Sequence, residues 1–123
     1  MKILIVDDSR FQQNFLVKIF QIFLPEGELL KADNGIKAFD IYKEERPDFV
    51  LTDLLMPERS GQDLLRLIKE FDQQSKVIVI TADIQKSTRD ELNQMGALAF
   101  FNKPLNNENI AQLIELIKEA AHA

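Results

Sequence analysis

Cysteine is absent from the 123 residues, and histidine occurs only once, at His122. Without thiols the chain can form no disulfide, no thiolate metal site and no cysteine nucleophile. The absence of cysteine also fits a reducing compartment, so we expect a cytoplasmic protein. We expect His122, close to the carboxyl terminus, to lie in a frayed tail and to have no chemical role.

Positive charge is not in excess, and long hydrophobic runs are missing. The 15 Lys and Arg residues are outnumbered by 20 Asp and Glu residues, which gives a net charge of −5. A compact nucleic-acid binder normally presents a basic face, so we expect no direct nucleic-acid partner. No apolar run reaches the ~18 residues that span a bilayer, and the run after Met1-Lys2 is too short for a signal-peptide core. We therefore expect no membrane partner.

Glycine and proline are few, with four of each, and all eight lie between periodic segments, where breakers belong. We find no linker, no internal repeat and no glycine-rich loop that could cradle a nucleotide phosphate. Apolar residues make up 46% of the chain, which is ordinary for a globular protein. The length predicts a single domain, 1–123, with one sizeable core.

Five short segments rich in apolar and β-branched residues predict strands, and a segment of helical periodicity follows each of them. The predicted strands are 3–6, 28–32, 49–52, 77–80 and 99–101. The predicted helices are 10–24, capped by Ser9; one after Asn34-Gly35; one from Ser60-Gly61 to Phe71; 85–95, closed by Gly96; and one capped by Asn106 or Asn107.

The first predicted helix is unusually apolar. Helical spacing predicts that one stripe faces the sheet, and that Val17, Phe20 and Leu24 then point elsewhere. The alternative to a wide buried stripe is an additional contact surface for a partner or a second copy. The second helix is expected to turn Ile36 and Phe39 inward, with Ile41 and Tyr42 beside them. The stripe expected to face the sheet on the first helix is Phe11, Phe15, Ile19, Ile22 and Phe23.

Five alternating strand–helix units with continuous apolar strands predict a parallel sheet with helices on both faces. Five units are too few for a closed eight-stranded barrel, so the fold class is an open, doubly wound α/β sheet. In such sheets, ligands bind at the carboxyl ends of the strands. Candidate functional residues are therefore expected at these strand ends.

Polar side chains follow four of the five predicted strands. Asp7-Asp8 follow the first strand, Asp53 the third, Thr81 the fourth and Lys103 the fifth. Clustered carboxylates need a neutralising cation, and oxygen-only ligands favour Mg²⁺ or Mn²⁺. A carboxylate beside a metal and a lysine can accept a phosphoryl group as an acyl phosphate, because both cations stabilise the developing negative charge.

Each of these residues also has an ordinary structural explanation. The Asp7-Asp8 pair could cap a helix, Asp53 could be a loop acid, Thr81 a strand end, and Lys103 a solvated cation. If all of these residues had only such structural roles, the chain would be an interaction module that works without phosphorylation. The whole set at one sheet edge favours a site instead.

The sequence resembles a response-regulator receiver domain, most closely the free-standing chemotaxis type. The resemblance covers essentially the whole chain and depends on four motifs in order. It implies a flavodoxin-like sheet of five parallel strands in the order 2-1-3-4-5 with five helices; this order comes from the resemblance alone. The motifs are Asp7-Asp8, Asp53-Leu54-Leu55-Met56-Pro57 with Gly61, Thr81-Ala82, and Lys103-Pro104.

The resemblance also implies a role for each acidic residue. Asp53 is the expected phosphoacceptor. Asp8 and Asp53 are the expected direct Mg²⁺ ligands, together with the backbone carbonyl of Leu55. Asp7 is expected to contribute mainly through a bound water. Leu55 and Asp83 flank the path of the hydrolytic water and are expected to tune the lifetime of the phosphoryl group.

Three further residues are implied in catalysis and switching. Lys103 is expected to pair with the phosphoryl group, and the Lys103–Pro104 bond is expected to be cis. Thr81 is expected to donate its hydroxyl to a phosphoryl oxygen and to move toward it on activation. Phe100 occupies the position of the aromatic residue that changes rotamer in this family.

The expected function is a phosphorylation-activated switch whose phosphodonor is a sensor histidine kinase. A downstream protein is expected to bind around residues 83–95 and 99–107, and a phosphatase is a further possible partner. The chain is expected to be a monomer or weak dimer and to catalyse only its own phosphorylation and dephosphorylation, so it is not expected to be an enzyme. A receiver domain from a longer DNA-binding regulator is the alternative. A phosphohydrolase would need a general acid where Leu55 stands.

Overall fold

The computed structural model describes residues 1–56, 60–83 and 85–121; Pro57 and His122 lie outside these residues. Five parallel strands form one sheet in the order β2-β1-β3-β4-β5, which confirms the expected flavodoxin-like order. The strands are β1 (Lys2–Val6), β2 (Glu28–Ala32), β3 (Phe49–Thr52), β4 (Val77–Thr81) and β5 (Ala99–Asn102). The helices are α1 (Arg10–Phe23), α2 (Gly35–Glu45), α3 (Gly61–Phe71), α4 (Lys86–Gln94) and α5 (Asn107–Ala121).

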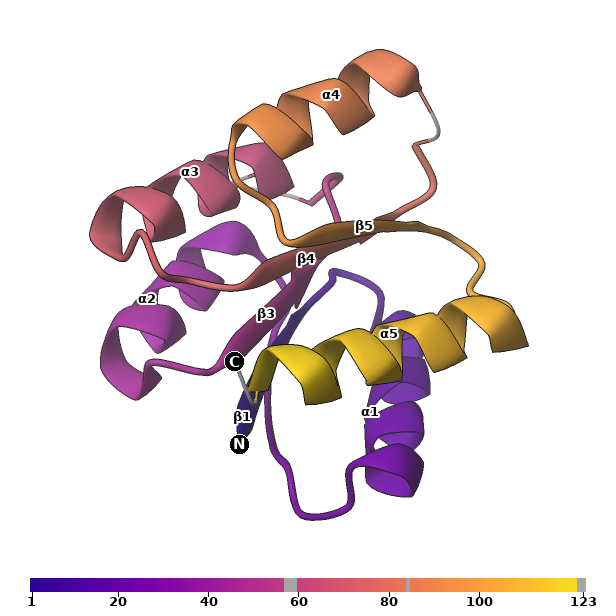
Figure 1. Ribbon diagram of the computed structural model, residues 1–123. Helices are drawn as coiled ribbons and strands as arrows, with labels where there is room; N and C mark the ends of the chain where they lie inside the picture. Colours follow the sequence, from indigo (N-terminus) through magenta and orange to yellow (C-terminus); the bar gives the residue numbers. More distant parts are fainter. Residues whose placement is uncertain (57–59, 84, 122–123) are drawn as a thin grey trace.

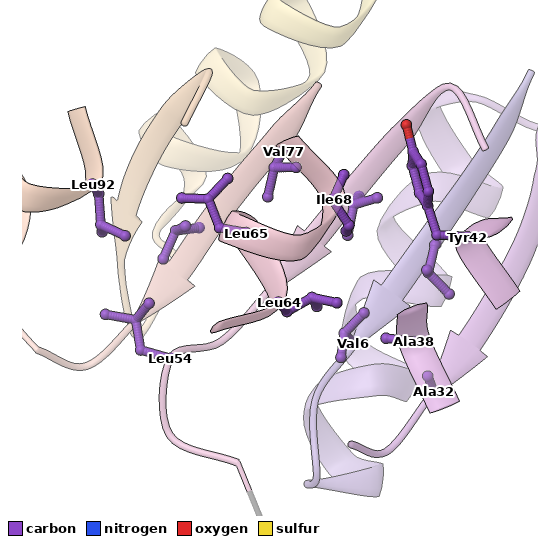
Figure 2. Close-up of a cluster of buried hydrophobic side chains, with 13 residues drawn as sticks. Val6, Ala32, Ala38, Tyr42, Leu54, Leu64, Leu65, Ile68, Val77 and Leu92 are labelled. Carbon is purple, nitrogen blue, oxygen red and sulfur yellow. The ribbon is translucent and has the colours of Figure 1, made fainter. Parts of the chain in front are cut away.

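The helices form two layers, with α2, α3 and α4 on one face of the sheet and α1 and α5 on the other (Figure 1). Successive strand residues point to opposite faces, so Leu4 and Val6 pack in the first layer and Ile3 and Ile5 in the second. Figure 2 shows the first layer, where side chains of α2, α3 and α4 meet those of the strands. The doubly buried central strands explain their continuous apolar sequences.

Polar caps begin four of the five helices, as the sequence predicts. The side chains of Ser9, Asn34, Ser60 and Asn106 each accept a hydrogen bond from the backbone N–H three residues later, at 2.8–3.3 Å. Such a bond satisfies one of the free donors of the first helical turn. Gly96 follows α4 with a φ of 91°, a left-handed conformation that favours glycine at this position.

Two strands extend one residue further than predicted, toward the edge that carries the polar residues. The register pairs Thr81 at the end of β4 with Asn102 at the end of β5. Both residues are polar, which is why periodicity alone ends the predicted strands before them. Within the described residues, no helix is long and apolar enough to cross a membrane.

The predicted orientation of α1 is only partly correct. Ile19 is buried and Phe15 packs against the core, as expected. Phe20, expected to point away, is also fully buried, whereas Phe11 and Ile22, expected to face the sheet, are 76% and 71% exposed. Apolar residues occupy so many positions of α1 that helical spacing fits more than one buried stripe. The orientation is settled by Gln13, whose side-chain amide donates to the backbone oxygens of Asp7 (2.6 Å) and Ala32 (3.1 Å) and holds that side of α1 against the sheet.

The prediction for α2 is partly correct. Tyr42 is buried, and Phe39 and Ile41 are half-buried. Ile36 is exposed, and Ala38 occupies the inner position instead. The small side chain of Ala38 lets α2 approach the strands closely. Hydrophobicity alone does not predict this arrangement, because hydrophobicity scales rank larger apolar residues above alanine as core residues.

Candidate functional site

Three predicted site residues meet at the carboxyl edge of the sheet. The Nζ atom of Lys103 lies 2.7 Å from Oδ2 of Asp7 and 2.7 Å from Oδ2 of Asp53. Asp7 follows β1, Asp53 follows β3 and Lys103 follows β5, so three strand ends contribute. The lysine side chain is 14% exposed and the two aspartates 4% and 12%, which places this ion-paired cluster largely out of solvent.

The two carboxylates keep Lys103 charged. Burial by itself lowers the pKa of this lysine and is the largest single influence. Hydrogen bonds to Asp53 and Asp7, together with their negative charges, outweigh it and raise the pKa above its usual value. A charged ammonium group therefore lies between the two aspartates.

Backbone groups hold the other oxygen of each carboxylate. Oδ1 of Asp7 accepts a hydrogen bond from the backbone N–H of Ser9 at 2.9 Å. Oδ1 of Asp53 accepts one from the backbone N–H of Leu54 at 2.6 Å. Each aspartate therefore presents its Oδ2 atom to Lys103. The backbone segment that directly follows each aspartate determines the orientation of its side chain.

Thr81 lies at the end of β4, between the strands that carry Asp53 and Lys103, and is fully buried. Its Oγ1 atom accepts a hydrogen bond from the backbone N–H of Asp83 at 3.3 Å. Its carbonyl oxygen accepts one from the backbone N–H of Lys103 at 2.8 Å, which ties the lysine to β4. The Lys103–Pro104 bond is cis, as expected.

Asp8 and Leu55 are not part of this cluster. Asp8 is exposed beside the buried Asp7, and the Leu55 side chain is 74% exposed. Across residues 1–56, 60–83 and 85–121, no three carboxylate or imidazole side chains lie close enough together to hold a metal ion. The structure thus joins Asp7 to Asp53 through Lys103 and leaves Asp8 outside this ion-paired cluster.

Residues 3–115 match the response regulator receiver domain. The chain belongs to this family. The curated relatives include sporulation initiation phosphotransferase F of Bacillus subtilis, 36% identical, with 93% of this chain and 90% of that protein covered. They also include the chemotaxis protein CheY of Bacillus subtilis, 36% identical, with coverages of 92% and 93%.

A solved structure gives the same fold. The receiver superposes with a TM-score of 0.85 on a chain of the CheX–CheY–BeF3–Mg²⁺ complex from Borrelia burgdorferi, at 31% identity, covering 98% of this chain and 89% of that one. That complex contains Mg²⁺ and a beryllofluoride group. The strand order and five helices of this receiver agree with such neighbours.

Asp83 directly follows the strand-end residues Thr81 and Ala82, and Phe100 packs in the same layer as α4. Both carboxylate oxygens of Asp83 are engaged at the start of α4: Oδ1 accepts from the backbone N–H of Gln85 and Oδ2 from the hydroxyl of Thr88, each at 2.9 Å. Phe100 is half-buried on β5, and the guanidinium of Arg89 lies 5.4 Å from the centre of its ring. Asp83 therefore has a structural role in the receiver that the sequence did not indicate.

Sequence reasoning missed Gln13 and the reason for Gly61. Gln13 holds the peptide of Asp7 in place through the hydrogen bonds described above, and its only signal in the sequence is a polar residue one turn after the Ser9 cap. At Gly61, an added Cβ atom would lie 2.2 Å from the carbonyl oxygen of Asp53 and 2.8 Å from Cα of Leu54. The start of α3 therefore contacts the loop that carries Asp53 at a distance that only glycine allows.

Proposed function

We propose that this receiver accepts a phosphoryl group from a phosphohistidine of a sensor histidine kinase onto Asp53. The observation that carries the proposal is the pairing of Lys103 with both Asp7 and Asp53 at 2.7 Å, on the sheet edge next to the buried Thr81. A carboxylate in this position is oriented and flanked by a cation before any phosphodonor arrives. The cytoplasm, where such kinases carry their phosphohistidine, is the proposed compartment.

The proposed chemistry is an in-line displacement. A carboxylate oxygen of Asp53 forms a bond to phosphorus while the phosphorus–nitrogen bond of the phosphohistidine breaks, and the electron pair of that bond stays on the imidazole. The ammonium of Lys103 pairs with the phosphoryl oxygens, where negative charge is concentrated. The hydroxyl of Thr81 leaves the N–H of Asp83 and donates to a phosphoryl oxygen.

The residues present fit Mg²⁺ as the cofactor, with Mn²⁺ as an alternative. Their ligand atoms are all oxygen, and two of the carboxylates already share one cation, the ammonium of Lys103. Asp8, Asp53 and the backbone carbonyl of Leu55 would hold the metal, with Asp7 acting through a bound water. When bound, Mg²⁺ supplies positive charge that neutralises the carboxylates and the phosphoryl oxygens.

Replacing Asp7 and Asp8 together by asparagine should abolish Mg²⁺ binding, because Asp53 and one carbonyl supply too few charged ligands. We expect the affinity measured by calorimetric titration to fall by at least about tenfold. The matched control is Asp33→Asn, an exposed acid that follows the neighbouring strand β2. Unchanged binding in the double variant would contradict the proposed ligand set.

We propose that the receiver signals through protein contacts on its α4–β5–α5 surface and has no turnover substrate of its own. Movement of Thr81 toward the phosphoryl group leaves space that the ring of Phe100 can fill. Phenylalanine has no hydroxyl, so this movement acts through packing. It would withdraw the ring from Arg89, which lies over it on the α4 surface.

Activation with beryllofluoride and Mg²⁺ should therefore change the environment of one side of the sheet. We expect the largest amide chemical-shift changes in residues 83–95 and 99–107, outside the immediate surroundings of Asp53. In Thr81→Ala, the changes around Phe100 should fall to less than about half, because the hydroxyl that links the two positions is gone. Shifts confined to α1 and β2 would contradict the proposal.

Leu55→Asn should shorten the lifetime of the phosphoryl group. Leucine cannot hydrogen-bond the attacking water, whereas asparagine can orient it. One such contact is worth about 1 kcal/mol, so we expect autodephosphorylation to become several-fold faster. The measurement is the decay of phosphoprotein at saturating Mg²⁺, with Leu98→Asn, another exposed leucine, as the control. Unchanged or slower decay would show that Leu55 does not shield the phosphoryl group.

The alternative to a receiver that acts by itself is one attached to a DNA-binding region. The chain covers 90% of the sporulation phosphotransferase and 93% of the Bacillus subtilis chemotaxis protein, which supports the first proposal. The length of the gene decides between them, since an open reading frame that continues past Ala123 into a basic domain would favour the second. A phosphatase that accelerates loss of the phosphoryl group is a further proposed partner.

A further inference from the structure

A second pocket opens at the edge of the sheet formed by β2, where residues of α1, β2 and α2 meet. Its volume is about 470 Å³, which is in the range of sites that hold small molecules. The pocket is separate from the cluster of Asp7, Asp53 and Lys103, because none of these three residues lines it. It is therefore a candidate for a function other than phosphotransfer.

Two buried residues give this pocket a fixed wall. The side-chain amide of Gln13 donates to the backbone oxygens of Asp7 at 2.6 Å and Ala32 at 3.1 Å. The same oxygen of Ala32 accepts a hydrogen bond from the backbone N–H of Asp7 at 3.1 Å. Ala32 and the half-buried Ile41 add apolar surface to the lining. The pocket thus has a wall held in place by backbone hydrogen bonds, with apolar surface for part of a ligand.

Three exposed cations, Arg10, Lys31 and Lys37, line the same pocket. The one carboxylate among the lining residues is Asp33, which pairs with Lys37 at 3.2 Å. Within the described part of the chain, neither Arg10 nor Lys31 has an ion-pair partner. The lining has a net charge of +2 in a chain whose net charge is −5, so this pocket concentrates positive potential on an acidic protein.

Two of these cations stand at helix starts, where cations are unfavourable. Arg10 is the first residue of α1, and Lys37 lies in the first turn of α2, which begins at Gly35. Neither helix has an acidic residue in its first turn. The amino-terminal end of a helix carries partial positive charge, so it favours acids and repels cations. An anion bound between the two helix starts would relieve this repulsion and gain from both helix dipoles.

We infer that this pocket binds a small phosphate ester with an apolar ring, of the size of a nucleoside monophosphate. The guanidinium of Arg10 can donate two hydrogen bonds to one phosphate, and the ammonium of Lys31 adds a second positive charge. The apolar surface of Ala32 and Ile41 would receive the ring. A concave site with a fixed wall suits a small molecule better than a flat protein surface. The site needs neither Asp53 nor Mg²⁺.

Calorimetric titration of the whole chain with adenosine monophosphate, in the presence of EDTA, tests the site. We expect saturable binding of one molecule per chain, with inorganic phosphate at least about tenfold weaker and adenosine not measurably bound, because the ester uses both the cations and the apolar wall. Arg10→Gln and Lys31→Gln should each weaken binding by at least about fivefold. Both side chains are exposed, so these variants should fold normally.

Lys43→Gln is the matched control. It removes the same charge from an exposed lysine of α2 that does not line the pocket, and it should bind the nucleotide like the wild type. Asp53→Asn should also bind normally, which separates this site from the phosphoacceptor proposed above. Absence of saturable binding overturns the inference. So does adenosine binding as tightly as its monophosphate, an equal loss in Lys43→Gln, or a loss in Asp53→Asn.

Discussion

Asp53→Asn is expected to lose phosphoryl incorporation entirely. A small acyl phosphate with Mg²⁺ should add the mass of one phosphoryl group to the wild-type chain and none to the variant, a fall of at least about a hundredfold in rate. An amide has no anionic oxygen to attack phosphorus. It still accepts the backbone hydrogen bond that Leu54 donates to this side chain at 2.6 Å, so the loop should keep its conformation. Intact-protein mass spectrometry measures the result.

The matched control for this substitution is Asp63→Asn. Asp63 is a partly exposed carboxylate on α3 that pairs with Arg66 at 3.0 Å and lies outside the cluster of Asp7, Asp53 and Lys103. We expect its variant to incorporate one phosphoryl group at the wild-type rate. Retention of the added mass in Asp53→Asn would falsify the assignment of Asp53 as phosphoacceptor, whereas loss in both variants would point to a nonspecific effect of charge.

Gly61→Ala is expected to cause the largest loss of stability among the substitutions considered. The new methyl group would lie 2.2 Å from the carbonyl oxygen of Asp53. Neither atom can rotate away, because the position of a Cβ atom is fixed by its own backbone and the oxygen is a backbone atom. Either α3 or the loop that carries Asp53 must move. We expect the free energy of unfolding to fall by roughly 2–4 kcal/mol, as measured by urea denaturation at an unchanged denaturant dependence.

Gly27→Ala provides the control for this second substitution. An added Cβ atom there lies 3.3 Å from its nearest neighbour, the backbone oxygen of Leu24. We expect a change of less than about 1 kcal/mol in either direction, because the lower entropy of the unfolded chain offsets a mild contact. Equal stability of the Gly61 and Gly27 variants would show that α3 can shift away from Asp53 at little cost.

The sequence predicts the strand–helix alternation well because the signals are local. Four apolar residues such as Val77-Ile78-Val79-Ile80 can hardly be anything but a buried strand, and Ser60 can cap a helix wherever that helix packs. The residues at which strands end are harder to predict, because they depend on pairing with a neighbouring strand and not on a local signal. Thr81 and Asn102 are polar, and they join β4 and β5 only because each pairs with the other across the sheet.

The orientation of α1 could not be read from its sequence. Hydrophobic periodicity compares one side of a helix with the other, and α1 is apolar on nearly all sides. A side-chain amide, that of Gln13, binds two backbone oxygens and decides which side is buried. Hydrophobic scales rank glutamine among surface residues, so the residue that determines the orientation is one that they ignore.

The sequence alone determined which residues reach the functional edge of this receiver. Parallel strands place their carboxyl ends at one edge, so Asp7, Asp53, Thr81 and Lys103 gather there whatever the details of packing. Only the tertiary structure decided that Lys103 pairs with Asp7 and Asp53 while Asp8 stays exposed. These contacts join residues 96 and 50 positions apart. Their distances depend on how the whole sheet and its helices pack, which no local pattern encodes.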